Sequence, residues 1–330
     1  MSRLPVSLSC LDYDRVRALE KGDVEAAGID LTFVPNPPDE SIWRMADNGE
    51  FDVAEMTFAT YLRLHTGGAD LIGLPVFVVR CFPHSGIFVR RGSGIREPRD
   101  LEGRRVGVGE YRMSIAVWAR GILAADHGVD PRAIEWCTAR REAAVDPAAG
   151  RITLLPDGPP LAERLAAGEI DALIAPRIPP AFRSDTDADE RLFPEPRQVE
   201  REYFARTGIF PMLHLVVMRR SLHAEQPWVA SSLYRAFVAA KEACYRELEQ
   251  TMEGLRVTAP WFEHHLDDVR RVMSADYWPY GLEANRTALE TFCRYAHEQQ
   301  VISRPVAVDE LFAGNADDRP VASTRTLIGA

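Results

Sequence analysis

The chain has 330 residues, with 46% apolar and 27% charged side chains, a balance typical of a globular protein and not of a disordered one. Its formal net charge of −10 argues against nucleic acid or an anionic membrane as a partner. The basic residues are almost all arginine, so that any anion site would use guanidinium forks, which suit carboxylates.

The first eighty residues alternate between short apolar strands and amphipathic helices. Strands are predicted at 5–10, 29–35, 51–57 and 71–78. Helices are predicted between them, each closed by a glycine, at 13–22, 39–49 and 58–68. This strand-helix alternation predicts an α/β fold with a mostly parallel sheet and right-handed crossovers.

A second α/β unit follows the first. Strands are predicted at 105–108 and 134–139, a helix at 114–128, and a helix running into a strand over 160–176. Beyond residue 219 the pattern is helical, at 226–250, 261–273 and 282–300. The polar tail after about residue 313 is expected to be loose or to pair with a partner.

Two internal echoes favour a pair of similar lobes. "NGEFDVAEM" (48–56) and "AGEIDALIA" (167–175) share a Gly-Glu-apolar-Asp-apolar corner between helix and strand. "FPHSGIFVR" (82–90) and "FPMLHLVVMR" (210–219) each combine a Phe-Pro step, a histidine and an apolar run that ends in arginine. A chain that leaves one lobe and later returns needs two crossing strands, and this second pair fits that role.

The predicted architecture is therefore two-lobed, with a central cleft above two crossing strands. Its boundaries are 1–86 and 213–330 for lobe one, 92–207 for lobe two, and 87–91 and 208–212 for the connecting strands. His84 and His214 would then look into the cleft as candidate proton donors, with Ser85 permitting close approach of a ligand. The alternatives are a hydrogen-bonded hinge histidine for His84 and a satisfied core residue for His214.

Other candidates follow the predicted strands, at the carboxyl ends where open α/β sheets present ligand sites. In "GVGEYRMS" (107–114) the start of a helix offers free N–H groups for a carboxylate. Glu110 could act as an acid there, and the guanidinium of Arg112 could bind a carboxylate through two hydrogen bonds. Arg177 follows the strand "DALIAP", and Arg140 follows "IEWCTA". Surface solvation would also account for Arg112, and a charge at a helix N-terminus for Glu110.

Lobe one has an equivalent corner in "SCLDYDR". Asp12 and Tyr13 in it could touch substrate hydroxyls, and Thr57 ends the third predicted strand. Helix capping alone would explain the aspartate and could explain the threonine.

Four segments of the chain carry a resemblance to a known family: "GVGEYRMSIAVWARGIL", "AAGEIDALIAPRIPPAF", "TGIFPMLHLVVMR" and "DYWPYGLEANRTALE". They resemble the 4,5-dihydroxyphthalate decarboxylase family. The resemblance covers nearly the whole chain, from "SLSCLDYDR" to "ELF" at 310–312. It implies the type II periplasmic-binding-protein fold and a cytoplasmic enzyme that makes protocatechuate from 4,5-dihydroxyphthalate. Related folds host transport, sensing and catalysis, so the fold alone does not select among them.

Decarboxylation of a hydroxylated aromatic acid without a cofactor requires a held carboxylate and a proton for the ring carbon. The candidate proton donors are His84, His214 and Glu110. The candidate substrate contacts are Arg177, Arg112, Ser85, Tyr111, Asp12, Tyr13, Thr57 and Arg140. The alternative function is a cytosolic solute-binding module for an aromatic or small dicarboxylate.

Cysteine usage and the N-terminus bear on compartment and cofactors. The five scattered cysteines form no C-x-x-C pair, which favours a reducing compartment over a disulfide framework or structural zinc. No signal-like apolar run opens the chain, and no segment approaches the roughly 18 apolar residues of a membrane span. We therefore expect a cytoplasmic protein with no metal and no cofactor, and a homo-oligomer would explain the long helical C-terminal part.

Overall fold

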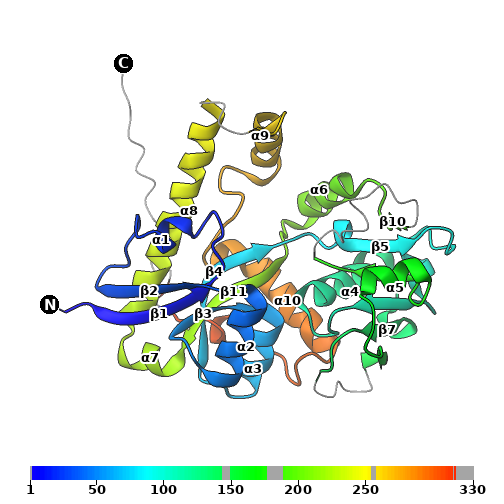
Figure 1. Ribbon diagram of the computed structural model, residues 1–330, viewed down its shortest axis with the longest axis horizontal. Coiled ribbons are helices and arrows are strands. Elements are labelled where there is room, and N and C mark those ends of the chain that lie inside the picture. Colours follow the sequence, from blue (N-terminus) through cyan, green and yellow to red (C-terminus); the bar gives the residue numbers. More distant parts are fainter. Residues whose placement is uncertain (1, 143–148, 177–188, 254–257, 315, 317–330) are drawn as a thin grey trace.

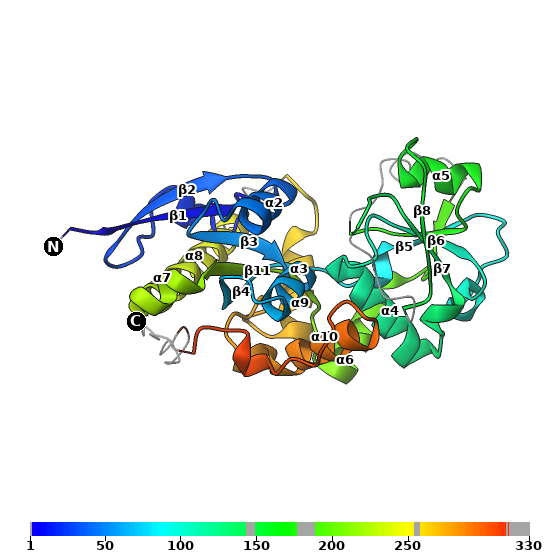
Figure 2. The ribbon, with the colours of Figure 1, turned by 90° about the horizontal axis from the view of Figure 1, so that it is seen from below.

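A computed structural model of the chain describes residues 2–142, 149–176, 189–253, 258–314 and 316. Two sheets, each with its own helices, form two lobes (Figure 1, Figure 2). The strand order is β2-β1-β3-β11-β4 in the first sheet and β10-β5-β9-β6-β7-β8 in the second. The predicted two-lobed α/β fold is thus confirmed, and both sheets are mixed because each contains antiparallel pairs.

In the first sheet, β3, β4 and β11 are buried over most of their length, as expected for strands covered on both faces, whereas β2 is largely accessible. The strands of this sheet are β1 (Leu4–Cys10), β2 (Ile29–Pro35), β3 (Val53–Thr57), β4 (Leu71–Arg80) and β11 (Met212–Arg219). Its helices are α1 (Arg17–Glu20), α2 (Pro38–Asn48), α3 (Phe58–Thr66), α7 (Arg220–Glu225) and α8 (Trp228–Glu253). β11 runs antiparallel between β3 and β4, so its first residues lie beside the last residues of β3.

The second sheet has shorter strands. They are β5 (Ile87–Arg90), β6 (Arg105–Val108), β7 (Glu135–Thr138), β8 (Arg151–Leu154), β9 (Ala172–Ile174) and β10 (Asp189–Arg191). Its helices are α4 (Ser114–His127), α5 (Leu161–Ala167) and α6 (Pro196–Thr207). β8 and β10 were not predicted, because neither is a buried apolar run: β8 is not buried, and β10 has the charged sequence Asp-Glu-Arg.

The Gly-Glu-apolar-Asp motif at 49–52 and 168–171 has the same structure in both lobes. Gly49 and Gly168 end α2 and α5 with φ of 57° and 76°, the left-handed region that favours glycine. Asp52 then accepts the backbone N–H of Ser7 in β1 at 2.9 Å, and Asp171 accepts that of Arg105 in β6 at 3.0 Å. Each aspartate thereby ties the incoming strand to its parallel neighbour.

The chain crosses between the lobes at two segments that touch. The N–H of Cys81 donates to the carbonyl of Pro211 at 3.0 Å, so the two crossings are hydrogen-bonded to each other there. The structure differs from the predicted boundaries at 87–91, because Ile87–Arg90 is β5 and pairs with β9 and β10 inside the second sheet. The short 3-10 turn His84–Gly86 leads directly into it.

The last helices are α9 (Phe262–Met273) and α10 (Arg286–Glu298). α10 lies between the lobes (Figure 1, Figure 2), where Phe292 stacks on Phe58 of α3 at 4.8 Å and packs at a tilt against Trp118 of α4 at 5.3 Å between ring centroids. One cluster of buried apolar side chains therefore extends from the first lobe through α10 into the second. Among the described residues, no helix combines the length and apolar character needed to cross a bilayer.

Candidate functional site

A buried carboxylate lies in the middle of β3. Glu55 is 0% exposed and accepts hydrogen bonds from the Tyr13 hydroxyl at 2.8 Å and the N–H of Leu11 at 3.2 Å. Its Oε1 is 2.6 Å from Nδ1 of His214. β1, β3 and β11 are neighbours in the sheet, and this order brings the three side chains together.

The charge on Glu55 is set by these partners. Burial alone would raise the pKa of Glu55, but the hydrogen bonds from His214 and Tyr13 and the His214 charge hold that pKa below its ordinary value. An ionised carboxylate only accepts hydrogen bonds, so Nδ1 of His214 carries the proton of this contact. The imidazole is 17% exposed, which leaves the rest of the ring able to reach a bound molecule.

Tyr13 is held as a neutral phenol. Burial and the negative charge of Glu55 raise its pKa above the ordinary value. The guanidinium of Arg15 stacks between the rings of Tyr13 and Trp278, at 4.3 Å and 4.4 Å from their centroids. Nε of Arg15 also donates to the Val78 carbonyl at 2.8 Å, which anchors the stack to β4.

The beginnings of α3 and α4 meet at the junction of the lobes. Thr57 caps α3 by accepting the N–H of Thr60 at 3.1 Å, and it lies opposite His214 in the β3–β11 register. The N–H of Ala59, in the first turn of α3, donates to the Ser114 hydroxyl of α4 at 3.1 Å. The strand-to-helix corners of the two lobes are therefore in contact, one carrying His214 and Glu55 and the other carrying residues 109–113.

The corner of lobe two already holds a carboxylate. Glu142 accepts the backbone N–H of Tyr111, through a short hydrogen bond, and that of Arg112 at 3.1 Å. Burial, with the charge of Glu110 adding to it, raises the pKa of Glu142 despite these hydrogen bonds. The N–H groups predicted to bind a ligand carboxylate do bind one here, from the chain itself.

Arg140 connects the two corners at the surface. Its guanidinium lies 3.1 Å from Asp39 at the start of α2 and 3.4 Å from Glu110. The side chain is 62% exposed, so solvent weakens both ion pairs. Glu110 and Arg140 are thus paired with each other, and Arg140 also reaches Asp39 of lobe one.

His84 has different surroundings from His214. It is 2% exposed, and its ring packs on Phe193 and Tyr203 at 5.4 Å and 5.2 Å between centroids. Burial lowers its pKa to about 4, so it is neutral at physiological pH. The structure differs from the prediction here: the contacts of His84 are those of a packed residue of lobe two, whereas His214 contacts Glu55.

The remaining candidates divide by location. Ser85 uses its N–H to bond Glu200 of α6 at 2.8 Å. The close approach at Gly86 is made by Ala175, the residue after β9, because an added Cβ would lie 2.4 Å from its carbonyl oxygen. Asp12 is exposed beside Tyr13, and Arg177 lies outside the described residues.

The sequence interpretation missed Glu55, Glu142 and Arg15. A signal for Glu55 was present in "FDVAEMT", where one charged residue interrupts an otherwise apolar strand. A carboxylate is rarely fully buried without partners, so such a residue predicts a polar cluster nearby. Glu142 and Arg15 offer no comparable signal, because surface solvation explains either.

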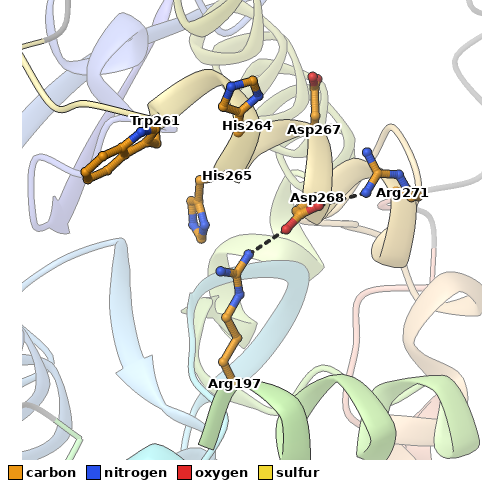
Figure 3. Close-up of a pocket in the computed structure, with 7 residues that line it drawn as sticks. All are labelled: Arg197, Trp261, His264, His265, Asp267, Asp268 and Arg271. Carbon is orange, nitrogen blue, oxygen red and sulfur yellow. Dashed lines mark hydrogen bonds and ion pairs between the residues drawn. The ribbon is translucent and has the colours of Figure 1, made fainter. Parts of the chain in front are cut away.

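A pocket of about 230 Å³ lies elsewhere, between α6 and α9 (Figure 3). Asp268 pairs there with Arg197 of α6 and Arg271, both at 2.8 Å. His265 points toward Arg197, whereas His264 points away (Figure 3). The pocket contains none of the predicted site residues, and the ion pairs already neutralise its carboxylate.

No metal centre is found in the described part of the chain. There, no group of three or more His, Cys, Asp or Glu side chains is arranged to hold an ion. The chemistry available at the lobe junction is that of a histidine backed by a carboxylate, together with N–H groups that bind carboxylates.

The fold places the protein among the two-lobed periplasmic-binding-protein-like folds. It is similar to the aliphatic sulphonate binding protein SsuA of Escherichia coli, with 14% identity and a TM-score of 0.56 over 96% of this chain and 99% of that one. A putative sulfonate-binding protein of Methylobacillus flagellatus gives 13% identity and a TM-score of 0.52 over 94% and 92% of the two chains. At these identities the likeness concerns the fold alone.

Sequence relatives identify the family. The chain is 32% identical over 321 residues to a 4,5-dihydroxyphthalate decarboxylase of Comamonas testosteroni, covering 94% of this chain and 97% of that protein. A protein of the same name from Pseudomonas putida is 32% identical over 62% of this chain and 83% of its own length. The NMT1/THI5-like family profile matches residues 15–156. The chain therefore belongs to the 4,5-dihydroxyphthalate decarboxylase family.

Proposed function

We propose that this protein is a carboxy-lyase that converts 4,5-dihydroxyphthalate to protocatechuate without a cofactor, at the junction of the two lobes. The names of both relatives support this reaction, and the similarity to the Comamonas testosteroni protein covers 94% of this chain. The observation that carries the proposal is the contact of His214 with the buried, ionised Glu55, at 2.6 Å. A histidine held in this way can deliver a proton to a substrate.

The reaction needs one proton at one ring carbon. Each carboxyl-bearing carbon of the substrate has a ring hydroxyl para to it, which feeds electron density to that carbon. When CO2 leaves, the electron pair of the broken carbon–carbon bond stays on the ring and takes the proton from Nε2 of His214. Glu55 stabilises the imidazolium beforehand, and the neutral imidazole regains a proton from water.

The other side chains of the junction complete the proposed site. Tyr13 donates to Glu55 and keeps its carboxylate in place. Glu110, Arg112 and Arg140 remain proposed substrate contacts on the side of lobe two. The free state of all five cysteines agrees with a cytoplasmic location, which belongs to the same proposal.

The direct test is turnover. Purified protein is incubated with 4,5-dihydroxyphthalate, and CO2 and protocatechuate are quantified; we expect them in equal amounts.

His214→Gln should lower kcat by about 10²–10⁴-fold, the range for a lost general acid. The control is His264→Gln, on the exposed side of α9. Absence of turnover with every member of a panel of hydroxylated aromatic acids would reject the proposal, and tight binding without product would favour a solute-binding module.

A further inference from the structure

The turn that precedes α4 holds a carboxylate from a distant part of the chain. The two oxygens of Glu142 accept the N–H groups of Tyr111 and Arg112, one each. Two adjacent N–H groups that share a carboxylate in this way form a small anion-binding concavity. The beginning of the 14-residue helix α4, three residues further on, adds its positive end.

A buried arginine, Arg120, contacts the residue that provides one of these N–H groups. Arg120 is 0% exposed, and its guanidinium lies 3.7 Å from the centre of the Tyr111 ring. It donates to the Tyr111 carbonyl at 2.7 Å and to Oε1 of Gln299 at 2.7 Å, while its third nitrogen has no hydrogen-bond partner among the described residues. Because both acceptors are neutral, the charge of Arg120 stays available to attract an anion at the turn.

Glu142 is a poorly suited permanent occupant. It is partly buried, and the negative charge of Glu110 is close enough to oppose its ionisation. A second carboxylate with the same geometry and a larger favourable contact surface can therefore take its place. An aromatic dicarboxylate has that property, since its ring also gains contacts at the junction.

The turn is also placed correctly relative to the proposed proton donor. The contact between Ala59 and Ser114 joins the starts of α3 and α4. Thr57, two residues before Ala59, pairs with His214 in the sheet. These contacts place the imidazole of lobe one and the N–H pair of lobe two on the two sides of the same lobe junction.

We propose that the N–H groups of Tyr111 and Arg112 are the subsite for the carboxylate that the substrate keeps, and that Glu142 occupies this subsite until the substrate displaces it. The identity of the ligand class rests on the proposed function. Glu142 is then an internal competitor, which lowers the affinity for carboxylate ligands and keeps the buried cation Arg120 compensated when no ligand is bound.

The test measures binding without turnover. Phthalate carries both carboxylates but no ring hydroxyl, and catechol carries both hydroxyls but no carboxylate. Isothermal titration of each ligand is compared among the wild type, Glu142→Ala and Glu142→Gln. We expect Glu142→Ala to tighten phthalate binding by about 5–10-fold, within the usual range of coupling between sites, and to leave catechol binding unchanged.

Controls separate this inference from a structural role of Glu142. Glu163→Gln removes an exposed carboxylate from α5 of the same lobe and should leave both affinities unchanged. If Glu142→Ala lowers the melting temperature, Glu142→Gln, which keeps one acceptor oxygen, carries the test and should give a smaller gain for phthalate. Unchanged or weaker phthalate binding in both variants would overturn the inference, even if the enzyme decarboxylates 4,5-dihydroxyphthalate; tighter binding would support it even if turnover fails.

Discussion

At the scale of single residues, the central feature is Glu55. Burying a carboxylate without partners costs several kcal/mol, and such a group would rather be protonated. Here four donors converge on it, the N–H of Leu11, the Tyr13 hydroxyl, the His214 ring and the Cys10 thiol, and its pKa lies below the ordinary value. The cluster therefore fixes the orientation of the His214 ring beside a buried carboxylate.

Replacing Glu55 tests that orientation. Glu55→Gln keeps the shape of the side chain but cannot stabilise an imidazolium, so we expect kcat to fall by about 10–100-fold or more with little change in KM. Steady-state kinetics with 4,5-dihydroxyphthalate give both parameters. Glu50→Gln, an exposed carboxylate five residues earlier, is the matched control. A variant that changed only KM would show that Glu55 does not act through the proton donor.

His84 has a different, pH-dependent role in stability. Its pKa is about 4 in the folded protein, below the ordinary value of 6.5 that it regains on unfolding. The unfolded chain therefore binds more protons between these values. The stabilising contribution of neutral His84 is complete above pH 6.5 and is lost as the pH falls toward 4, by up to about 1.4 kcal/mol per pH unit.

His84→Phe isolates this contribution. Phenylalanine retains the ring packing on Phe193 and Tyr203, so the variant should keep kcat within about twofold, a change well under 1 kcal/mol in activation free energy. Its melting temperature should fall less than that of the wild type between pH 6.5 and 4.5, measured by circular dichroism. Taking the difference between the two proteins cancels titratable groups that do not interact with residue 84. Parallel melting curves, or a large loss of kcat, would contradict this assignment.

At the scale of elements, the sequence was most informative where one segment controls its own conformation. The glycines at 49 and 168 each end a helix, and the aspartates at 52 and 171 each tie two strands, so the echo in the sequence is an echo in structure. The end of β4 was less predictable, because its last residues depend on pairing with β11. α1 is also shorter than predicted, at four residues.

The packing of α4 on α10 provides a test at this scale. A Cβ on Gly121 would lie 2.1 Å from Cδ2 of Tyr295, so the two helices approach as closely as they do only because residue 121 is glycine. Gly121→Ala should lower the free energy of unfolding by about 1–3 kcal/mol, the usual cost of overpacking, as measured by urea denaturation. In a Tyr295→Ala background, Gly121→Ala should lower the free energy of unfolding by less than it does in the wild type. Strictly additive effects of the two substitutions would rule out the clash.

At the scale of the whole molecule, the two lobes are held together by buried contacts as well as by the crossing segments. Arg80, at the end of β4, donates to the carbonyls of Phe210 and Pro279 at 2.8 Å and 2.7 Å and also bonds Asn285. It therefore joins both crossings to the segment before α10. Burial lowers the pKa of this arginine to about 9, which reflects the absence of a carboxylate among its hydrogen-bond partners in the described chain.

Removing this clamp should loosen the junction. Arg80→Met keeps an apolar chain of similar length but leaves buried acceptors without donors, so we expect a loss of about 2–4 kcal/mol in the free energy of unfolding. Arg80→Lys should be intermediate, because an ammonium cannot span acceptors on three segments. Denaturant unfolding followed by tryptophan fluorescence measures both. Equal stability of Arg80→Met and the wild type would show that the crossings need no such clamp.

The sequence by itself determined the α/β class, the two-lobed fold, most strands and helices, and the family, because periodicity, capping glycines and long motifs are local properties of the chain. It also pointed to the corners after β1, β3 and β6. Only the tertiary structure decided which polar residues meet: that His214 pairs with Glu55, that His84 packs among aromatic rings, and that Glu142 occupies the N–H groups of Tyr111 and Arg112. Those contacts join residues 30 to 159 positions apart, and such pairings depend on strand order and helix packing, which no local pattern encodes.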